Sequence, residues 1–170
     1  NVDVSGSARG LFSSGQMQAA FELIVPLAIN FDDNQSLQVF TFASGDEYTT
    51  EITPDATANN YSDYIAKNII NNPNVKKWGG TDYTPVLREN LIRLGFIKKS
   101  LFGGLKFVKD NGSGFPALIV CYTDGSNSDH AATKKFLKEC QDAEVQAYFL
   151  FIGIGVDSFR NILDYGDLYS

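Results

Sequence analysis

The chain has 170 residues, 44% of them apolar, which is enough for one domain with a sizeable hydrophobic core. A net charge of −6 argues against nucleic acid or an anionic membrane surface as a partner, because such partners require clustered Lys and Arg. The same acidic balance is compatible with a cation as ligand.

The two cysteines, Cys121 and Cys140, lack the spacing to histidine that is typical of a zinc site. We expect both to be reduced thiols, which favours a cytoplasmic protein. No stretch approaches the ~20 apolar residues of a membrane span, and no signal peptide is visible. The first motif lies almost at residue 1, so we expect this single domain, residues 1–170, to be a fragment of a longer protein.

Hydrophobic periodicity predicts strands that alternate with helices along the chain. In the first half of the chain we expect a strand end at 2–4, a helix at 16–30, paired strands at 37–44 and 48–52, a helix over 61–69 and a loop at 73–80. In the second half we expect a helix over 85–94, a strand at 116–125, a helix over 132–140, a strand at 145–155 and a short helix from 159. Asp129 is expected to cap the helix over 132–140.

This alternation predicts an α/β fold with a doubly wound, mostly parallel, Rossmann-like sheet and helices on both faces. The apolar runs at 116–125 and 145–155 are typical of strands that are buried on both sides. Residues 95–115, rich in Gly and Lys, are interpreted as an excursion from the domain in the form of a hairpin with solvated lysines.

In a sheet of this class, ligands bind at the carboxyl ends of the strands. Three segments place oxygen-bearing side chains there, and these side chains are Asp3, Ser5, Ser7, Thr81 and Asp124. Alternate residues leaving a strand point the same way, so the first three converge if the loop curls at a glycine. An all-oxygen set predicts a site for a hard divalent cation, with Mg²⁺ the best fit and Ca²⁺ or Mn²⁺ accepting similar ligands.

Only two of these five side chains are carboxylates, and if one or both of them act through water, a bound dication stays electrophilic towards an incoming anion. An Asp or Glu from a protein partner would complete its coordination. The residues therefore predict a docking site that needs no nucleophile and no catalytic residue.

The segments "DVSGS", "GGT" and "TDG" resemble the metal-ion-dependent adhesion site of von Willebrand factor A (VWA) domains, in the order of that family. The segments "FDDNQSLQVFTF", "WGGTDYTPVL", "TDGSNSD" and "FLFIGIG" resemble more closely the VWA domain in the C-terminal part of TerF-type tellurium-resistance proteins. The resemblance runs from Asp3 to about Asp167.

The resemblance implies that Ser5, Ser7 and Thr81 are hydroxyl ligands of the metal, and that Asp3 and Asp124 coordinate it directly or through water. It also implies a partner-binding module in a tellurium-resistance or chemical-stress response. The acidic net charge separately excludes nucleic acid and membrane as expected partners.

The alternative is a magnesium-dependent phosphohydrolase. Such enzymes also place an Asp after the first strand, and one type adds a second acidic residue two positions later. Here that position is Ser5, and the three loop motifs contain no lysine, although Lys76 and Lys77 lie nearby. The metal alone would have to act as the Lewis acid.

Three further residues have open or ordinary interpretations. His130, the single histidine, is expected at the surface in the first turn of a helix. Trp78 and Tyr83 flank Thr81, and either could lie on the rim of a partner surface or pack beneath the loop.

Overall fold

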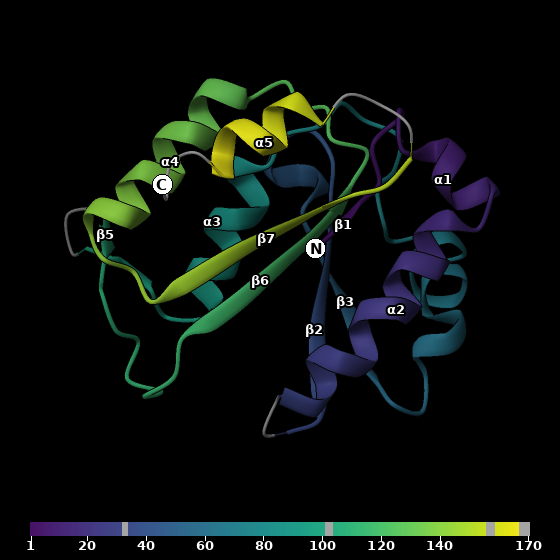
Figure 1. Cartoon of the computed structure of the whole chain (residues 1–170), viewed down its shortest axis with the longest axis horizontal. Helices are drawn as coiled ribbons and strands as arrows, with labels where there is room; N and C mark the ends of the chain where they lie inside the picture. Colours follow the sequence, from purple (N-terminus) through teal and green to yellow (C-terminus); the bar gives the residue numbers. More distant parts are fainter. Residues whose placement is uncertain (32–33, 101–103, 156–158, 167–170) are drawn as a thin grey trace.

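The protein is built around a five-stranded mixed sheet (Figure 1). The computed structural model describes residues 1–31, 34–100, 104–155 and 159–166. The strand order is β3-β2-β1-β6-β7, where the strands are β1 (Val2–Asp3), β2 (Ser36–Phe42), β3 (Thr50–Thr57), β6 (Ala117–Thr123) and β7 (Ala147–Gly153). Strand β1 runs parallel to β2 and β6, β6 runs parallel to β7, and only β3 is antiparallel to its neighbour. The predicted mostly parallel α/β sheet is therefore confirmed.

Helices cover both faces of the sheet, as predicted (Figure 1). They are α1 (Arg9–Ser13), α2 (Gln16–Phe31), α3 (Thr84–Arg93), α4 (His130–Asp142) and α5 (Arg160–Gly166). Helix α2 buries Met17 and Phe21 in the core on one face. Helices α3 and α4 bury Leu91 and Phe136 in a second core on the other face. The sheet thus separates two apolar layers, which is why both helix groups are amphipathic.

The helix expected over 61–69 differs from a regular α-helix. It consists of a 3-10 turn, η2 (Tyr61–Asp63), followed by a π-helix, η3 (Ile65–Ile70). A second 3-10 turn, η1 (Asp46–Tyr48), joins β2 to β3. The wider turn of the π-helix still buries Ile65 and Ile69 in the core, so packing is kept although the hydrogen-bonding pattern changes.

The strand at 145–155 is not buried on both faces, which corrects the sequence-based expectation. Within the described residues, β7 pairs only with β6 and forms an edge of the sheet. Its inward residues Phe149 and Phe151 pack on the core, but Tyr148 is 66% exposed and Leu150 43% exposed. An apolar run alone does not distinguish a central strand from an edge strand with one open face.

The excursion at 95–115 forms the predicted hairpin, from β4 (Ile97–Lys99) and β5 (Leu105–Phe107); residues 101–103 lie outside the described part. Phe96 and Ile97 are buried and anchor the hairpin to the core. Lys98 and Lys106 face each other across the two strands and are exposed, consistent with solvated lysines.

Strand β1 is shorter than its neighbours, and this leaves space between β2 and β6. A cavity of about 300 Å³ lies there, lined by both strands, α3 and Asn1. The Asn1 backbone nitrogen donates to the Val120 carbonyl oxygen over 2.7 Å. Beyond Asn1 the carboxyl ends of β1 and β6 lie side by side, which sets the position of the candidate site.

Two further findings bear on the composition. Cys121 and Cys140 are both buried and free, as expected. In the described parts of the chain, no helix has the length and apolar character needed to cross a bilayer.

Candidate functional site

The first polar segment begins where β1 ends. Asp3 is the last residue of that strand, and its side chain is completely buried. One carboxylate oxygen, Oδ1, accepts a hydrogen bond from the Ser5 backbone N–H over 2.8 Å. The hydroxyl oxygens of Ser5 and Ser7 lie 3.1 Å apart, with Ser5 buried and Ser7 exposed. The loop thus curls so that its three predicted side chains lie close together.

The second carboxylate, that of Asp124, follows directly after β6. Its Oδ1 accepts a hydrogen bond from the Ser126 backbone N–H over 3.2 Å. Its Oδ2 is buried and has no hydrogen-bond partner among the described residues. Since a buried oxygen without a partner costs roughly 1–3 kcal/mol, this atom is a strong candidate for an interaction with a cation.

The Asp3 and Asp124 carboxylates interact electrostatically. The pKa of Asp3 is raised to about 6, chiefly by burial and to a smaller extent by the negative charge of Asp124, while hydrogen bonds from Ser5 and Thr123 act in the opposite direction. Two buried carboxylates that repel each other form a region of negative potential, which a divalent cation would neutralise.

Thr123 and Tyr83 support Asp3, and sequence reasoning missed this role for both. The Thr123 hydroxyl donates to Asp3 Oδ2 over 2.8 Å. The Tyr83 hydroxyl lies 2.7 Å from the Thr123 hydroxyl, and all three side chains are buried. In the sequence, Thr123 could be recognised only as a hydroxyl residue at the end of an apolar strand, just before Asp124. Its hydrogen-bond partner Asp3 is 120 residues away, so the sequence did not reveal the contact.

Backbone hydrogen bonds attach the Thr81 loop to the other two loops. The Trp78 N–H donates to the Val4 carbonyl over 2.7 Å, and the Gly6 N–H donates to the Gly79 carbonyl over 2.8 Å. On the other side, the Ser128 N–H donates to the Thr81 carbonyl over 2.7 Å. Thr81 is only 5% exposed. All three predicted segments are therefore held together where strands β1 and β6 end, at the carboxyl end of the sheet.

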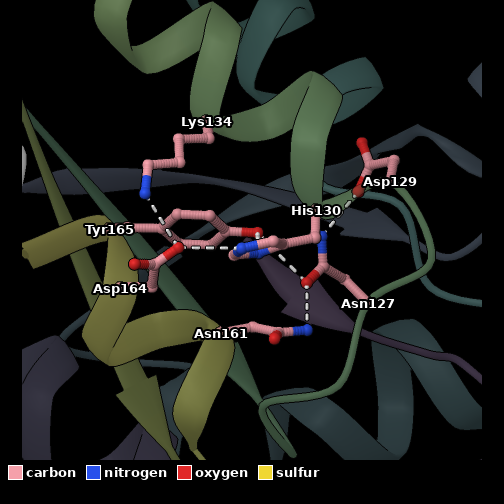
Figure 2. Close-up of polar contacts among 7 residues, drawn as sticks. All are labelled: Asn127, Asp129, His130, Lys134, Asn161, Asp164 and Tyr165. Atoms are coloured by element: carbon pink, nitrogen blue, oxygen red, sulfur yellow. Dashed lines mark hydrogen bonds and ion pairs between the residues drawn. The ribbon is translucent and has the colours of Figure 1, made fainter.

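Asp129 has a different role from the predicted cap of α4. Its carboxylate makes no capping bond to that helix and instead accepts bonds from the Tyr83 and Thr84 N–H groups, over 3.0 and 2.8 Å. Asn127 donates a further bond to it over 2.8 Å (Figure 2). Burial acts to raise the pKa of Asp129, but these hydrogen bonds outweigh it and the pKa is lowered. The loop after Asp124 is thereby tied to the start of α3.

His130 begins α4, as the expected position in the first turn of a helix requires, and its half-buried side chain contacts α5. Its Nε2 lies 2.9 Å from an Asp164 carboxylate oxygen, and its Nδ1 lies 3.0 Å from the Tyr165 hydroxyl (Figure 2). The Tyr165 hydroxyl donates to Asn127 over 3.1 Å, and Lys134 also contacts Asp164. Helix α5 is therefore attached to the loop that follows Asp124.

Trp78 and Tyr83, whose positions sequence reasoning left open, have opposite surroundings. Tyr83 is fully buried beneath the loop, at ring-centroid distances of 5.5 Å from Phe42 and 5.4 Å from Phe151. Trp78 is half-buried on the rim, where it contacts Phe12 edge-to-face and the Arg9 guanidinium lies 5.3 Å from its ring centroid.

The donors at the site are oxygens only. The described residues contain no cluster of three or more His, Cys, Asp or Glu side chains arranged for a metal. A cation at this site would therefore depend on two carboxylates, on hydroxyl groups and on water, which are donors that hard divalent cations accept.

Comparison with known proteins identifies the family. The family model described as the vWA found in the TerF C terminus matches residues 1–169. The chain belongs to this vWA-TerF-like family. A curated relative, "Uncharacterized protein YcbR" of Bacillus subtilis (strain 168), is 30% identical over 163 residues. The match covers 96% of this chain but 59% of that relative, so this chain spans little more than half the length of YcbR. No solved structure shows significant similarity to the chain.

Proposed function

We propose that this VWA domain is a metal-dependent protein-binding module. In this proposal a divalent cation, Mg²⁺ before Ca²⁺ or Mn²⁺, binds at the ends of β1 and β6 and receives an acidic side chain of a protein partner. The observation that carries the proposal is Asp124 Oδ2, a buried carboxylate oxygen without a partner among the described residues. When bound, the cation supplies positive charge and a coordination position for the partner's carboxylate.

The hydrogen bonds suggest different roles for the two carboxylates. Asp124 has one oxygen free for direct coordination. Both Asp3 oxygens already accept hydrogen bonds, from Ser5 and from Thr123, so this carboxylate acts best through water while its charge balances the cation. Ser5, Ser7 and Thr81 would supply uncharged hydroxyl oxygens. Two carboxylates and neutral donors offset the dication without filling its coordination, so it retains affinity for a third carboxylate.

The proposed setting follows from the TerF branch of the family. The module would act in tellurium resistance or a related chemical-stress response in the cytoplasm. Its partner would be a protein, with neither nucleic acid nor membrane required. The length of YcbR beyond the matched segment is compatible with a module that works within a larger protein.

Two contacts argue against Lys76 and Lys77 as the phosphate-binding cations of a hydrolase. A phosphohydrolase needs a cation near the metal to balance phosphate charge. The Lys77 ammonium donates to three backbone carbonyls, and Lys76 forms an ion pair with Glu47 over 3.1 Å. Both lysines next to the Thr81 loop are therefore already engaged. An assay with a generic aryl phosphate and Mg²⁺ tests this distinction, since Asp3-dependent hydrolysis would support the enzyme instead.

The direct test is the thermal midpoint of metal-stripped protein with and without Mg²⁺, Mn²⁺ or Ca²⁺. A ligand at about a hundred times its Kd stabilises a protein by roughly 2.7 kcal/mol, which corresponds to a shift of about 5–10 °C for a domain of this size. We expect Asp124→Asn to abolish the shift, and Asp110→Asn, in an exposed turn, to retain it. No shift with any of the three ions at millimolar concentration would contradict the proposal.

A further inference from the structure

The rim beside the strand-end site has a strained backbone at Trp78. This residue has a φ of 71°, in the left-handed region that is unfavourable for a bulky side chain. The Trp78 N–H is fixed to the Val4 carbonyl, between Asp3 and Ser5. The strain is therefore located at the site itself, where such conformations often place a side chain for a purpose.

The strained conformation places the Trp78 ring between two residues of α1. The ring meets Phe12 edge-to-face at a centroid distance of 5.6 Å and an interplanar angle of 79°. The Arg9 guanidinium lies 5.3 Å from the same ring centroid, within the range of a cation–π contact. Arg9 is two residues beyond Ser7, and its backbone N–H donates to the Gly6 carbonyl over 3.4 Å. The guanidinium is thus held at the edge of the loop that carries the predicted hydroxyl ligands.

Arg9 differs from the nearby cations Lys76 and Arg88, which both form ion pairs. Glu47 forms an ion pair with Lys76, and Asp46 forms one with Arg88. Arg9 is exposed and has no ion pair with any described residue. A guanidinium on an aromatic face keeps its N–H edge free, and that edge matches the two oxygens of a carboxylate.

We propose that Arg9, held on the ring of Trp78, is a second carboxylate-binding residue beside the strand-end site, so that the partner presents two acidic side chains within a few residues of each other. This inference rests on the proposed function, in which the first carboxylate goes to the cation. Arg9 would then add both selectivity and local positive charge on an acidic domain. The partner segment is accordingly an acidic peptide, and an isolated Asp or Glu is a weaker ligand.

The test uses blocked six-residue peptides of Gly that carry one Asp, or a first Asp and a second Asp one to four positions later. Binding in 10 mM Mg²⁺ is measured by calorimetry and by the fluorescence of Trp78, the single tryptophan of the chain. We expect at least one two-Asp peptide to bind about tenfold more tightly than the one-Asp peptide, as a charge-assisted contact would give.

Arg9→Gln should reduce that advantage to about twofold or less, and Arg9→Lys should give an intermediate value because it keeps the charge without the planar fork. Arg160→Gln, the same change at an exposed position of α5, should leave the advantage intact. Equal affinity for one-Asp and two-Asp peptides, an advantage that survives Arg9→Gln, or no binding of any peptide would each overturn the inference.

The thermal shift with Mg²⁺ separates this inference from the proposed function. We expect Arg9→Gln to keep the full shift, since Arg9 is not a proposed metal ligand. Suppose that the thermal shift is normal, that the one-Asp peptide binds only with Mg²⁺, and that Arg9→Gln does not change the preference for two-Asp peptides. That result would contradict the second carboxylate contact and leave the proposed function standing. If the wild-type protein shows no thermal shift with Mg²⁺, both the proposed function and the inference that rests on it are contradicted.

Discussion

The Thr123 hydroxyl donates a hydrogen bond to the Asp3 carboxylate over 2.8 Å, across two adjacent strands whose residues are 120 positions apart. Both side chains are completely buried. This bond connects the carboxyl ends of β1 and β6 at the side-chain level, and Tyr83 extends it toward α3. The orientation of Asp3 thus depends on residues outside the three sequence motifs.

Replacement of Thr123 by Val should destabilise the protein by about 1–3 kcal/mol at neutral pH, because a buried carboxylate oxygen loses a donor. The two side chains have nearly the same shape, so packing changes little. Urea denaturation measures the effect. Thr53→Val, at an exposed position, is the matched control and should change the free energy of unfolding by about 0.5 kcal/mol or less. Equal effects of the two changes would contradict the role of Thr123.

Metal-free protein should lose stability as the pH rises from about 4 to about 6. The folded pKa of Asp3 is about 6, against an ordinary value of 3.8, so the unfolded chain releases this proton first. The stabilisation is fully present below 3.8 and is lost as the pH rises through the folded pKa, a change on the order of 3 kcal/mol.

Urea denaturation in the presence of a chelator, at pH values across this interval, measures the effect. Asp3→Asn should show a shallower loss of stability, and Asp110→Asn should behave as the wild type does. The prediction would be wrong if Asp3→Asn retained the full wild-type slope.

Asp129→Asn should reduce the free energy of unfolding by about 2 kcal/mol at neutral pH. The carboxylate accepts bonds from two backbone N–H groups at the start of α3, and an amide offers a single acceptor oxygen. Hydrogen exchange should show faster opening of the loop 124–129, which the Asp129 carboxylate attaches to the start of α3. The matched change, Asp110→Asn, removes a carboxylate that accepts one N–H in an exposed turn and should cost far less. Similar costs at both positions would argue against this role.

Gly79→Ala should be harmful where Gly80→Ala is tolerated. A Cβ at position 79 would lie 2.8 Å from the Ser44 hydroxyl oxygen and 2.9 Å from the Tyr48 ring, whereas a Cβ at position 80 meets nothing closer than 3.5 Å. We expect a loss of about 1–3 kcal/mol for Gly79→Ala and about 0.5 kcal/mol or less for Gly80→Ala. Thermal or urea denaturation of the two variants tests this, and equal stability would show that the loop relaxes freely around the added methyl group.

Local pattern was sufficient for the fold class. The period of the apolar residues identified α2, α3 and α4, because a helix that packs on a sheet must present an apolar stripe whatever its neighbours are. The pattern did not distinguish the edge strand β7 from a central strand, since Tyr148 and Leu150 are apolar yet exposed. Nor did it show the change to a π-helix at Ile65–Ile70, which keeps the same residues buried.

The sequence by itself determined which residues could serve at the strand ends: Asp3, Ser5 and Ser7 by alternation, and Thr81 and Asp124 by their place after a loop and a strand. Tertiary structure alone decided how they are held. The Thr123 contact with Asp3, the use of Asp129 by α3, and the left-handed Trp78 with Arg9 on its ring all join segments that are distant in sequence or strained in backbone. Short-range propensity carries no information on such contacts, because their energy comes from burial and from pairing that exist only once the sheet has formed.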